Sequence, residues 1–184
     1  MTCIIALEHE SKVWMGCDSA LLDAWDIRQL VDPKIIHAVE IEMLIGCGGS
    51  LRVQQLIRYN LEIPENNYMA HEEDMRYIVN RFIPALRTCL KDGGETKIEN
   101  NHEEMEAVLL LGWHGKAYAI QRNFQVDRIA TRFTAMGVGE NYAMGALAVM
   151  DTEGRDPERM VLIALEIAST FSNGVCGPFH VFSV

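Results

Sequence analysis

The sequence has few basic residues, no long apolar run and no closely spaced cysteines, and each absence excludes a class of protein. Its 184 residues contain 16 Lys and Arg against 26 Asp and Glu, a formal net charge of −10. Scattered basic residues in an acidic chain offer no face for the phosphates of nucleic acid. No apolar run approaches the roughly 18 residues of a membrane-spanning helix, and the start, MTCIIALEHE, lacks the basic segment of a secretory signal. We therefore expect neither nucleic acid nor a membrane as a partner.

Cofactor and metal motifs are also missing. The five cysteines form no CxxC pair and are odd in number, which argues against a disulfide framework or a zinc site and indicates a reducing cytoplasm. No HExxH or GxSxG motif is present. The GCGGS run at 46–50 precedes an expected helix but lacks the Lys of a phosphate-binding loop, so a nucleotide-binding module is the weakest interpretation. We expect no cofactor and no metal.

The composition is that of an ordinary globular chain, with 49% hydrophobic and 23% charged residues, and the length predicts one domain over 1–184. Apolar residues recur at spacings of three and four from Met75 to Leu90, which predicts a helix. Two polar stretches, 62–74 and 91–106, are expected to be loops or helix ends. Three further helices are expected after Ser50, over about 140–150, and from the Asp156-Pro157-Glu158 start.

The expected strands come in pairs. Their apolar runs are Cys3–Leu7, Lys12–Asp18, Lys34–Val39, Ile41–Cys47, Ala107–Trp113 and Lys116–Gln121. The last two flank His114-Gly115, a two-residue hairpin signal. Four strands followed by two helices, repeated and closed by a last strand, predict an α+β fold. In this four-layer αββα sandwich, two antiparallel sheets pack face to face between helix pairs.

The second residue is the first with a specific chemical use. Aminopeptidase removes Met1 when a small residue such as Thr2 follows it, and the chain would then begin with Thr2. An N-terminal threonine carries a nucleophilic hydroxyl and a basic amine on one residue. An unperturbed α-amine has a pKa of about 7.7–8.0, so part of it is free base at neutral pH. Many proteins begin Met-Thr by chance, so Thr2 alone is a weak signal.

Two charged residues strengthen it. Asp18 ends the second expected strand and Lys34 opens the third. If the first three strands are neighbours, both side chains can meet Thr2 at one end of a sheet. The Lys34 ammonium would favour the Thr2 alkoxide, and the Asp18 carboxylate would hold Lys34 in place. A purely structural ion pair is an equally good interpretation of this spacing.

Taken together, these segments resemble the proteasome β-type peptidases, especially the HslV-type branch, within the N-terminal nucleophile hydrolases. The resemblance is carried by MTCIIAL at the start, GCDSA at 16–20, DPKI at 32–35 and IGCGGS at 45–50. It continues in GVGENYAMGALAVM at 137–150 and DPERMVLIALEIA at 156–168, and it is weakest over about 60–105.

The resemblance implies roles for individual residues. Thr2 would be the nucleophile and, through its amine, the general base; Lys34 would tune it and Asp18 would orient Lys34. The backbone N–H of Gly48 or Gly49 would stabilise the oxyanion. The family's fold is the same αββα sandwich. Its members form rings of six or seven subunits, often doubled, and many receive unfolded protein or peptide substrates from a ring ATPase. In the HslV-type branch simple removal of Met1 exposes the nucleophile.

The sequence departs from the family beside the expected amine. Val138 stands where the family has Ser, and Thr170 and Asn173 stand where it has Asp and Ser. We expect Thr170, Ser172 or Asn173 to assist the amine instead. Because of these departures, a catalytically silent, structural ring subunit is an alternative interpretation. A second alternative is an amidase that acts on a small amide.

Substrate preference follows from the resemblance only in outline. It places the specificity pocket near five residues of mixed type: Leu21, Asp32, Ile36, Cys47 and Ser50. Asp32 would favour a basic residue before the cut.

Overall fold

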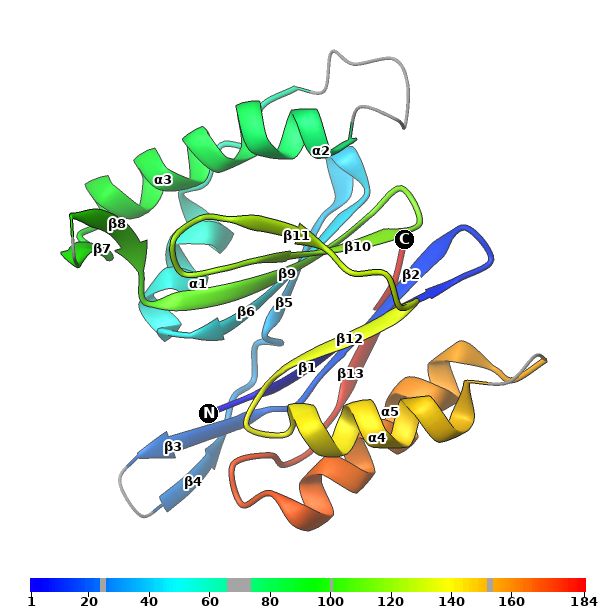
Figure 1. Ribbon diagram of the computed structural model, residues 1–184. Helices are drawn as coiled ribbons and strands as arrows, with labels where there is room; N and C mark the ends of the chain where they lie inside the picture. The colour runs from blue at the N-terminus through cyan, green and yellow to red at the C-terminus, as the bar shows by residue number, and fades with distance from the viewer. Residues whose placement is uncertain (24–25, 66–73, 100, 152–153) are drawn as a thin grey trace.

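The computed structural model describes residues 1–23, 26–65, 74–99, 101–151 and 154–184. Its layers are a helix layer, two sheets packed face to face, and a second helix layer (Figure 1). The expected αββα sandwich is therefore confirmed. Within the described residues, no helix combines the length and the apolar character needed to cross a membrane.

The first sheet has four antiparallel strands and includes the N-terminal segment. Its order is β12 (Phe133–Gly137), β1 (Cys3–His9), β2 (Lys12–Cys17) and β13 (His180–Ser183). One face of this sheet packs on α4 (Glu140–Met150) and α5 (Pro157–Phe171). Asp156 caps α5 by accepting a hydrogen bond from Glu158 N, and Pro157 begins it, as expected.

The second sheet has five antiparallel strands. Its order is β11 (Val126–Arg128), β10 (Lys116–Ile120), β9 (Ala107–Trp113), β6 (Met43–Gly49) and β5 (Ile35–Ala38). A short 3₁₀ turn, η1 (Val39–Ile41), joins β5 to β6, and His114-Gly115, both with positive φ, join β9 to β10. The two inner faces form a core of small and medium apolar side chains, including Ile4, Met15 and Leu110.

The outer face of the second sheet is covered by two helices. Ser50 caps α1 (Leu51–Tyr59) by accepting hydrogen bonds from Arg52 N and Val53 N. The expected helix over 75–90 is one continuous helix built of α2 (Asp74–Tyr77), a π-helical segment η3 (Ile78–Phe82) and α3 (Ile83–Asp92). Pro84 lacks an N–H and its ring crowds the carbonyl four residues earlier, which accounts for the wider π turn before it.

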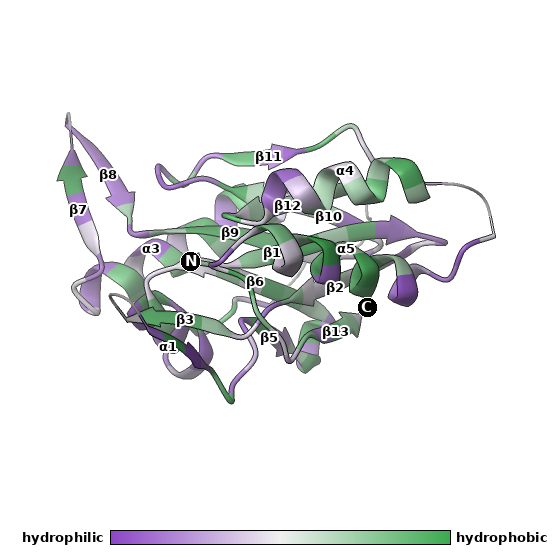
Figure 2. Ribbon diagram, turned by 90° about the horizontal axis from the view of Figure 1, so that it is seen from below, coloured by the Kyte–Doolittle hydropathy of each residue, from purple (hydrophilic) through white to green (hydrophobic). Residues whose placement is uncertain are grey.

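Two hairpins were not expected. β3 (Ala20–Asp23) pairs with β4 (Asp26–Gln29), and β7 (Thr96–Glu99) pairs with β8 (His102–Met105). The prediction of a loop over 91–106 is therefore wrong, while in the loop predicted over 62–74 residues 66–73 lie outside the described part of the chain. Figure 2 shows β7 and β8 projecting from the body. Of their eight residues only Met105 is buried, so the hairpin has no alternating apolar pattern for sequence analysis to detect.

Candidate active site

Thr2, Asp18 and Lys34 come together at one end of the sandwich, but they come from two sheets. The expectation that their three strands are neighbours in one sheet is wrong, because the strand after Lys34 belongs to the facing sheet. Thr2 directly precedes β1, and Asp18 directly follows β2. Because β1 and β2 are antiparallel neighbours, Asp18 lies beside Cys3, and Asp18 N donates to Cys3 O at 3.2 Å. Lys34 directly precedes β5 on the facing sheet, and its carbonyl accepts from Cys47 N at 2.9 Å.

The Asp18 carboxylate is fully buried and satisfied by three donors. Oδ1 accepts from Lys34 Nζ and from Cys3 N, both at 2.8 Å, and Oδ2 accepts from Ala20 N at 2.8 Å. Two backbone donors and one ammonium leave the carboxylate a single orientation. It therefore holds the Lys34 ammonium at a defined point between the two sheets.

That point is next to the nucleophile's own backbone. Lys34 Nζ donates to Met1 O at 3.2 Å, and Met1 O belongs to the peptide bond whose nitrogen is Thr2 N. Removal of Met1 would leave the Thr2 α-amine in the place of that peptide nitrogen. A buried ammonium beside a hydroxyl and an amine stabilises an alkoxide and disfavours a second positive charge on the amine.

Helix α1 helps to place Lys34. Gln54 Nε2 and Arg58 Nη2 each donate to Pro33 O at 2.7 Å, directly before Lys34. Gln54 is buried although it is polar, and this bond satisfies its amide. Neither residue carried a signal in the sequence, because their partner is a backbone carbonyl about 20 residues away along the chain.

Thr2 is enclosed by glycines. A Cβ on Gly48 would lie 3.2 Å from Thr2 Cγ2, so Gly48 permits close approach of β6 to the threonine. Gly137, which sequence analysis had not singled out, has φ +97°, and a Cβ there would lie only 2.1 Å from Thr2 O. Gly49 has φ +126° and closes β6 just before helix α1. Gly48 thus brings backbone next to Thr2, near the N-terminal, positive end of α1, whereas a Cβ on Gly49 would lie 2.5 Å from Glu106 O.

The residues expected to assist the amine are arranged differently. Thr170 is exposed, and its hydroxyl donates to Glu166 O at 2.9 Å within its own helix. Gly174 lies beside both Met1 and Val138: a Cβ on Gly174 would lie 2.7 Å from Met1 Sδ and 2.8 Å from Val138 Cγ2. Val138 therefore presents an apolar group where the resemblance implies a hydroxyl.

Cysteines near Thr2 are poor nucleophiles. Burial, with a smaller contribution from the Asp18 carboxylate, raises the pKa of Cys3 to about 12. Burial likewise raises the pKa of Cys17 to about 12. Because the thiolate is the reactive form, both thiols are inert near neutral pH. All five cysteines are free thiols.

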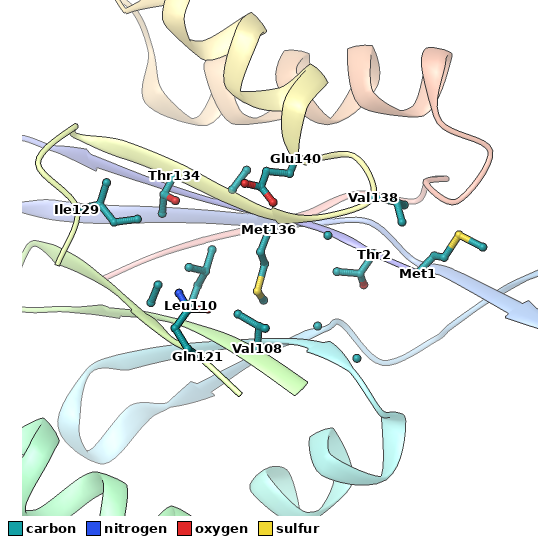
Figure 3. Close-up of a pocket in the computed structure, with 15 residues that line it drawn as sticks. Met1, Thr2, Val108, Leu110, Gln121, Ile129, Thr134, Met136, Val138 and Glu140 are labelled. Carbon is teal, nitrogen blue, oxygen red and sulfur yellow. The ribbon is translucent and has the colours of Figure 1, made fainter. Parts of the chain in front are cut away.

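Thr2 lines a cavity of about 460 Å³ that extends between the sheets (Figure 3). Of the described residues that line it, none is among the five expected for the specificity pocket. Cys47 and Ile36 instead point to the α1 side of their sheet, where they pack in the outer core. The reason is strand alternation: Gly46 and Gly48 face the inner layer, so Cys47 between them faces outward.

Comparison with known proteins places this geometry in a structural class. No family model matches the chain, and no curated protein matches it by sequence. Among solved structures, BPH from Thiobacillus denitrificans in complex with epoxomicin has a TM-score of 0.79 at 16% identity, over 100% of this chain and 98% of that one. HslV from Trypanosoma brucei has a TM-score of 0.68 at 18% identity, over 99% and 98%. Anbu, an ancestral beta-subunit from Yersinia bercovieri, has 0.73 at 14% identity, over 100% and 81%.

The chain therefore has the fold of the proteasome-like N-terminal nucleophile hydrolases. Within that class its fold is that of HslV and Anbu, so the resemblance in the sequence is confirmed at the level of the fold. At 14–18% identity the comparisons establish the fold alone, so the chemistry has to be inferred from the residues of the site.

Proposed function

We propose that this protein is a threonine peptidase of the proteasome type, with Thr2 as the nucleophile after removal of Met1. The observation that carries the proposal is the buried Asp18–Lys34 pair, whose ammonium donates to the carbonyl that precedes Thr2 N. An ion pair with a purely structural role would not require this hydrogen bond to the N-terminal segment.

The reaction divides into acylation and hydrolysis. Thr2 Oγ attacks the carbonyl carbon of the scissile bond while the Thr2 α-amine accepts its proton. The backbone N–H of Gly48 or Gly49 stabilises the negative oxygen of the tetrahedral intermediate. The intermediate collapses to an ester on Thr2, and the protonated α-amine of Thr2 gives its proton to the leaving nitrogen. Water, deprotonated by the amine, then hydrolyses the ester.

Lys34 and Asp18 support both steps. The Lys34 charge lowers the energy of the developing alkoxide and favours the neutral, basic form of the amine. Asp18 supplies the counter-charge without which burying an ammonium at 3% exposure would be costly.

For the assembly, we propose a homo-oligomeric ring of six or seven subunits, single or doubled, that acts on peptide or unfolded-protein substrates and accepts a ring ATPase. The fold shared with HslV supports it. Helix α4 adds support, because its outward face carries exposed Tyr142 and Val149 rather than charges, as expected of a helix covered by another subunit. One domain over 1–184 and a cytoplasmic location complete the proposal, and the five free thiols fit a reducing compartment.

A specific observation favours the silent ring subunit as the second candidate. With Met1 in place, its carbonyl accepts a hydrogen bond from Lys34 and its side chain lies beside Gly174, so the Thr2 nitrogen is part of a peptide bond and Lys34 has a partner without a free amine. In that case Asp18 and Lys34 would be structural.

Intact-mass spectrometry before and after treatment with a peptide vinyl sulfone distinguishes the two candidates. The peptidase loses Met1 and gains one adduct, which maps to Thr2 and is absent from Thr2→Ala. Retained Met1 with no adduct would favour the silent subunit. An amidase for small amides would lose Met1, hydrolyse a small acyl amide, and react poorly with the peptide probe.

A further inference from the structure

The cavity beside Thr2 reaches the amine side of the nucleophile. It is lined there by Met1 and Val138, and on the β6 side by Gly48 and Gly49. In the reaction proposed above, the α-amine passes its proton to the leaving nitrogen of the substrate. The residue that follows the scissile bond must therefore lie on this same side.

The walls of the cavity are mainly apolar. Val108 and Leu110 of β9, Ala119 of β10 and Met136 of β12 contribute aliphatic or thioether surface from both sheets. Gln121, the amide in the wall, already donates to Asp127 Oδ2 at 2.8 Å. A substrate side chain would find few unpaired polar groups here, and burial of apolar surface would supply the binding energy.

The charge in the cavity is of one sign. Among its described lining residues the ionisable side chain is Glu140, the first residue of α4. An acidic substrate side chain would meet this carboxylate and, among the described lining residues, no cationic side chain. A basic one could pair with the exposed Glu140, but to reach the apolar wall it would have to leave this carboxylate and bury its charge, which costs free energy.

Met136 narrows the cavity next to Thr2. A Cβ on Gly48 would lie 3.4 Å from Met136 Cε and 3.5 Å from Met136 Sδ, so this side chain reaches from β12 across to β6. Figure 3 shows it projecting into the cavity between Thr2 and Leu110. Methionine is unbranched and adapts its shape, so Met136 can move aside for an entering group.

We propose that this cavity binds an apolar side chain, of the size of Leu or Phe, from the residue directly after the scissile bond, and that Ala119 and Met136 set its size. The inference rests on the proposed peptidase function and adds the specificity of the leaving half of the substrate. It also assigns a use to residues of β9, β10 and β12 that lie outside the pocket implied by the resemblance.

The test uses a peptide whose cleavage site has been mapped by mass spectrometry, resynthesised with Gly, Leu, Phe, Arg or Glu after the cut. The quantity measured is kcat/KM, because it covers the steps in which the leaving residue is still attached. We expect the Leu and Phe peptides to exceed the Gly and Glu peptides by about tenfold or more. Equal values for all five, or a preference for Arg, would overturn the proposal.

Two variants locate the preference. Ala119→Phe fills the cavity and reduces the preference for Leu and Phe over Gly by about tenfold. Met136→Ala enlarges the cavity and raises kcat/KM of the Phe peptide relative to that of the Leu peptide. Ala130→Phe makes the same change at an exposed position outside the cavity and leaves the order unchanged. An unchanged preference in both cavity variants would overturn the assignment.

Labelling of Thr2 by the peptide vinyl sulfone separates the two levels of failure. The probe carries a sulfone in place of the leaving residue and lacks that residue's side chain, so its labelling reports the nucleophile without recognition of that side chain. Labelling without a side-chain preference in cleavage overturns the cavity proposal alone. Absence of both labelling and cleavage overturns the peptidase function and the cavity proposal with it.

Discussion

Lys34 Nζ and Asp18 Oδ1 are 2.8 Å apart, and the two side chains are 3% and 0% exposed. Breaking a buried pair by removing one partner leaves a buried, uncompensated charge, whereas replacing both partners by neutral groups avoids that cost. The same pair therefore has a stability effect and a proposed catalytic effect, and variants can separate them.

We expect Lys34→Ala to lower the free energy of unfolding by about 3–5 kcal/mol and to slow labelling of Thr2 by about 100-fold. The double variant Asp18→Asn/Lys34→Met should recover much of the stability, because no buried charge remains, but none of the labelling rate. Thermal unfolding and probe kinetics on the same samples provide the two readouts. Labelling that recovered together with stability would make the pair structural.

Replacement of glycine by alanine should have opposite effects on stability at Gly137 and at Gly145. Gly137→Ala places a methyl group in a backbone region that L-residues avoid and 2.1 Å from Thr2 O, so it should destabilise the fold by several kcal/mol and displace Thr2. Gly145 lies inside α4 with nothing within 4 Å of a new Cβ, so Gly145→Ala should stabilise the protein by about 0.4–1 kcal/mol. Differential scanning calorimetry of both variants checks the signs.

The parts of this structure that could be predicted from the sequence are those with a local signature. The strands and helices have an apolar period, and Asp18 and Lys34 stand at the ends of strands. Antiparallel pairing of β1 and β2 brings Asp18 beside the N-terminal segment, whereas Lys34 reaches it from the facing sheet, which the sequence pattern did not predict. The β7–β8 hairpin is local, but its partly exposed strands have no alternating apolar pattern. The fixing of Pro33 by Gln54 depends on a polar contact between separated segments, which leaves no periodic pattern either.

The cavity illustrates the same limit. Its walls come from β9, β10 and β12, and any one of these side chains looks like ordinary core in the sequence. The specificity pocket expected from the resemblance also ignored strand alternation, which turns Cys47 to the outer face of its sheet.

Thiol reagents should leave the nucleophile intact. Burial raises the pKa of Cys3, Cys17 and Cys47 to about 12, so their thiolate fraction at pH 8 is about 10⁻⁴. We expect iodoacetamide to modify the partly exposed Cys89 and Cys176 first, and Cys3 only after denaturation. Peptide mapping identifies the modified sites, and Cys3→Ala should still be labelled at Thr2. Inactivation through rapid modification of Cys3 would instead point to a cysteine nucleophile.

The contact between Glu103 and Arg87 should make the β7–β8 hairpin sensitive to acid. Arg87 Nε donates to Glu103 Oε2 at 3.0 Å, and this hydrogen bond holds the pKa of Glu103 below its ordinary value. A carboxyl whose pKa is lower in the folded state stabilises the fold above its unfolded pKa, about 4.3, and loses that contribution as the pH falls through the folded value. Arg87→Ala should therefore lower the free energy of unfolding at pH 6 and change it little at pH 3.

The control, Arg81→Ala, changes an exposed arginine of the same continuous helix. Its effect on the free energy of unfolding should be the same at the two pH values. Urea unfolding of the three proteins at both pH values measures the difference, and an Arg87→Ala effect that is equal at pH 3 and pH 6 would show that the ion pair does not hold the hairpin.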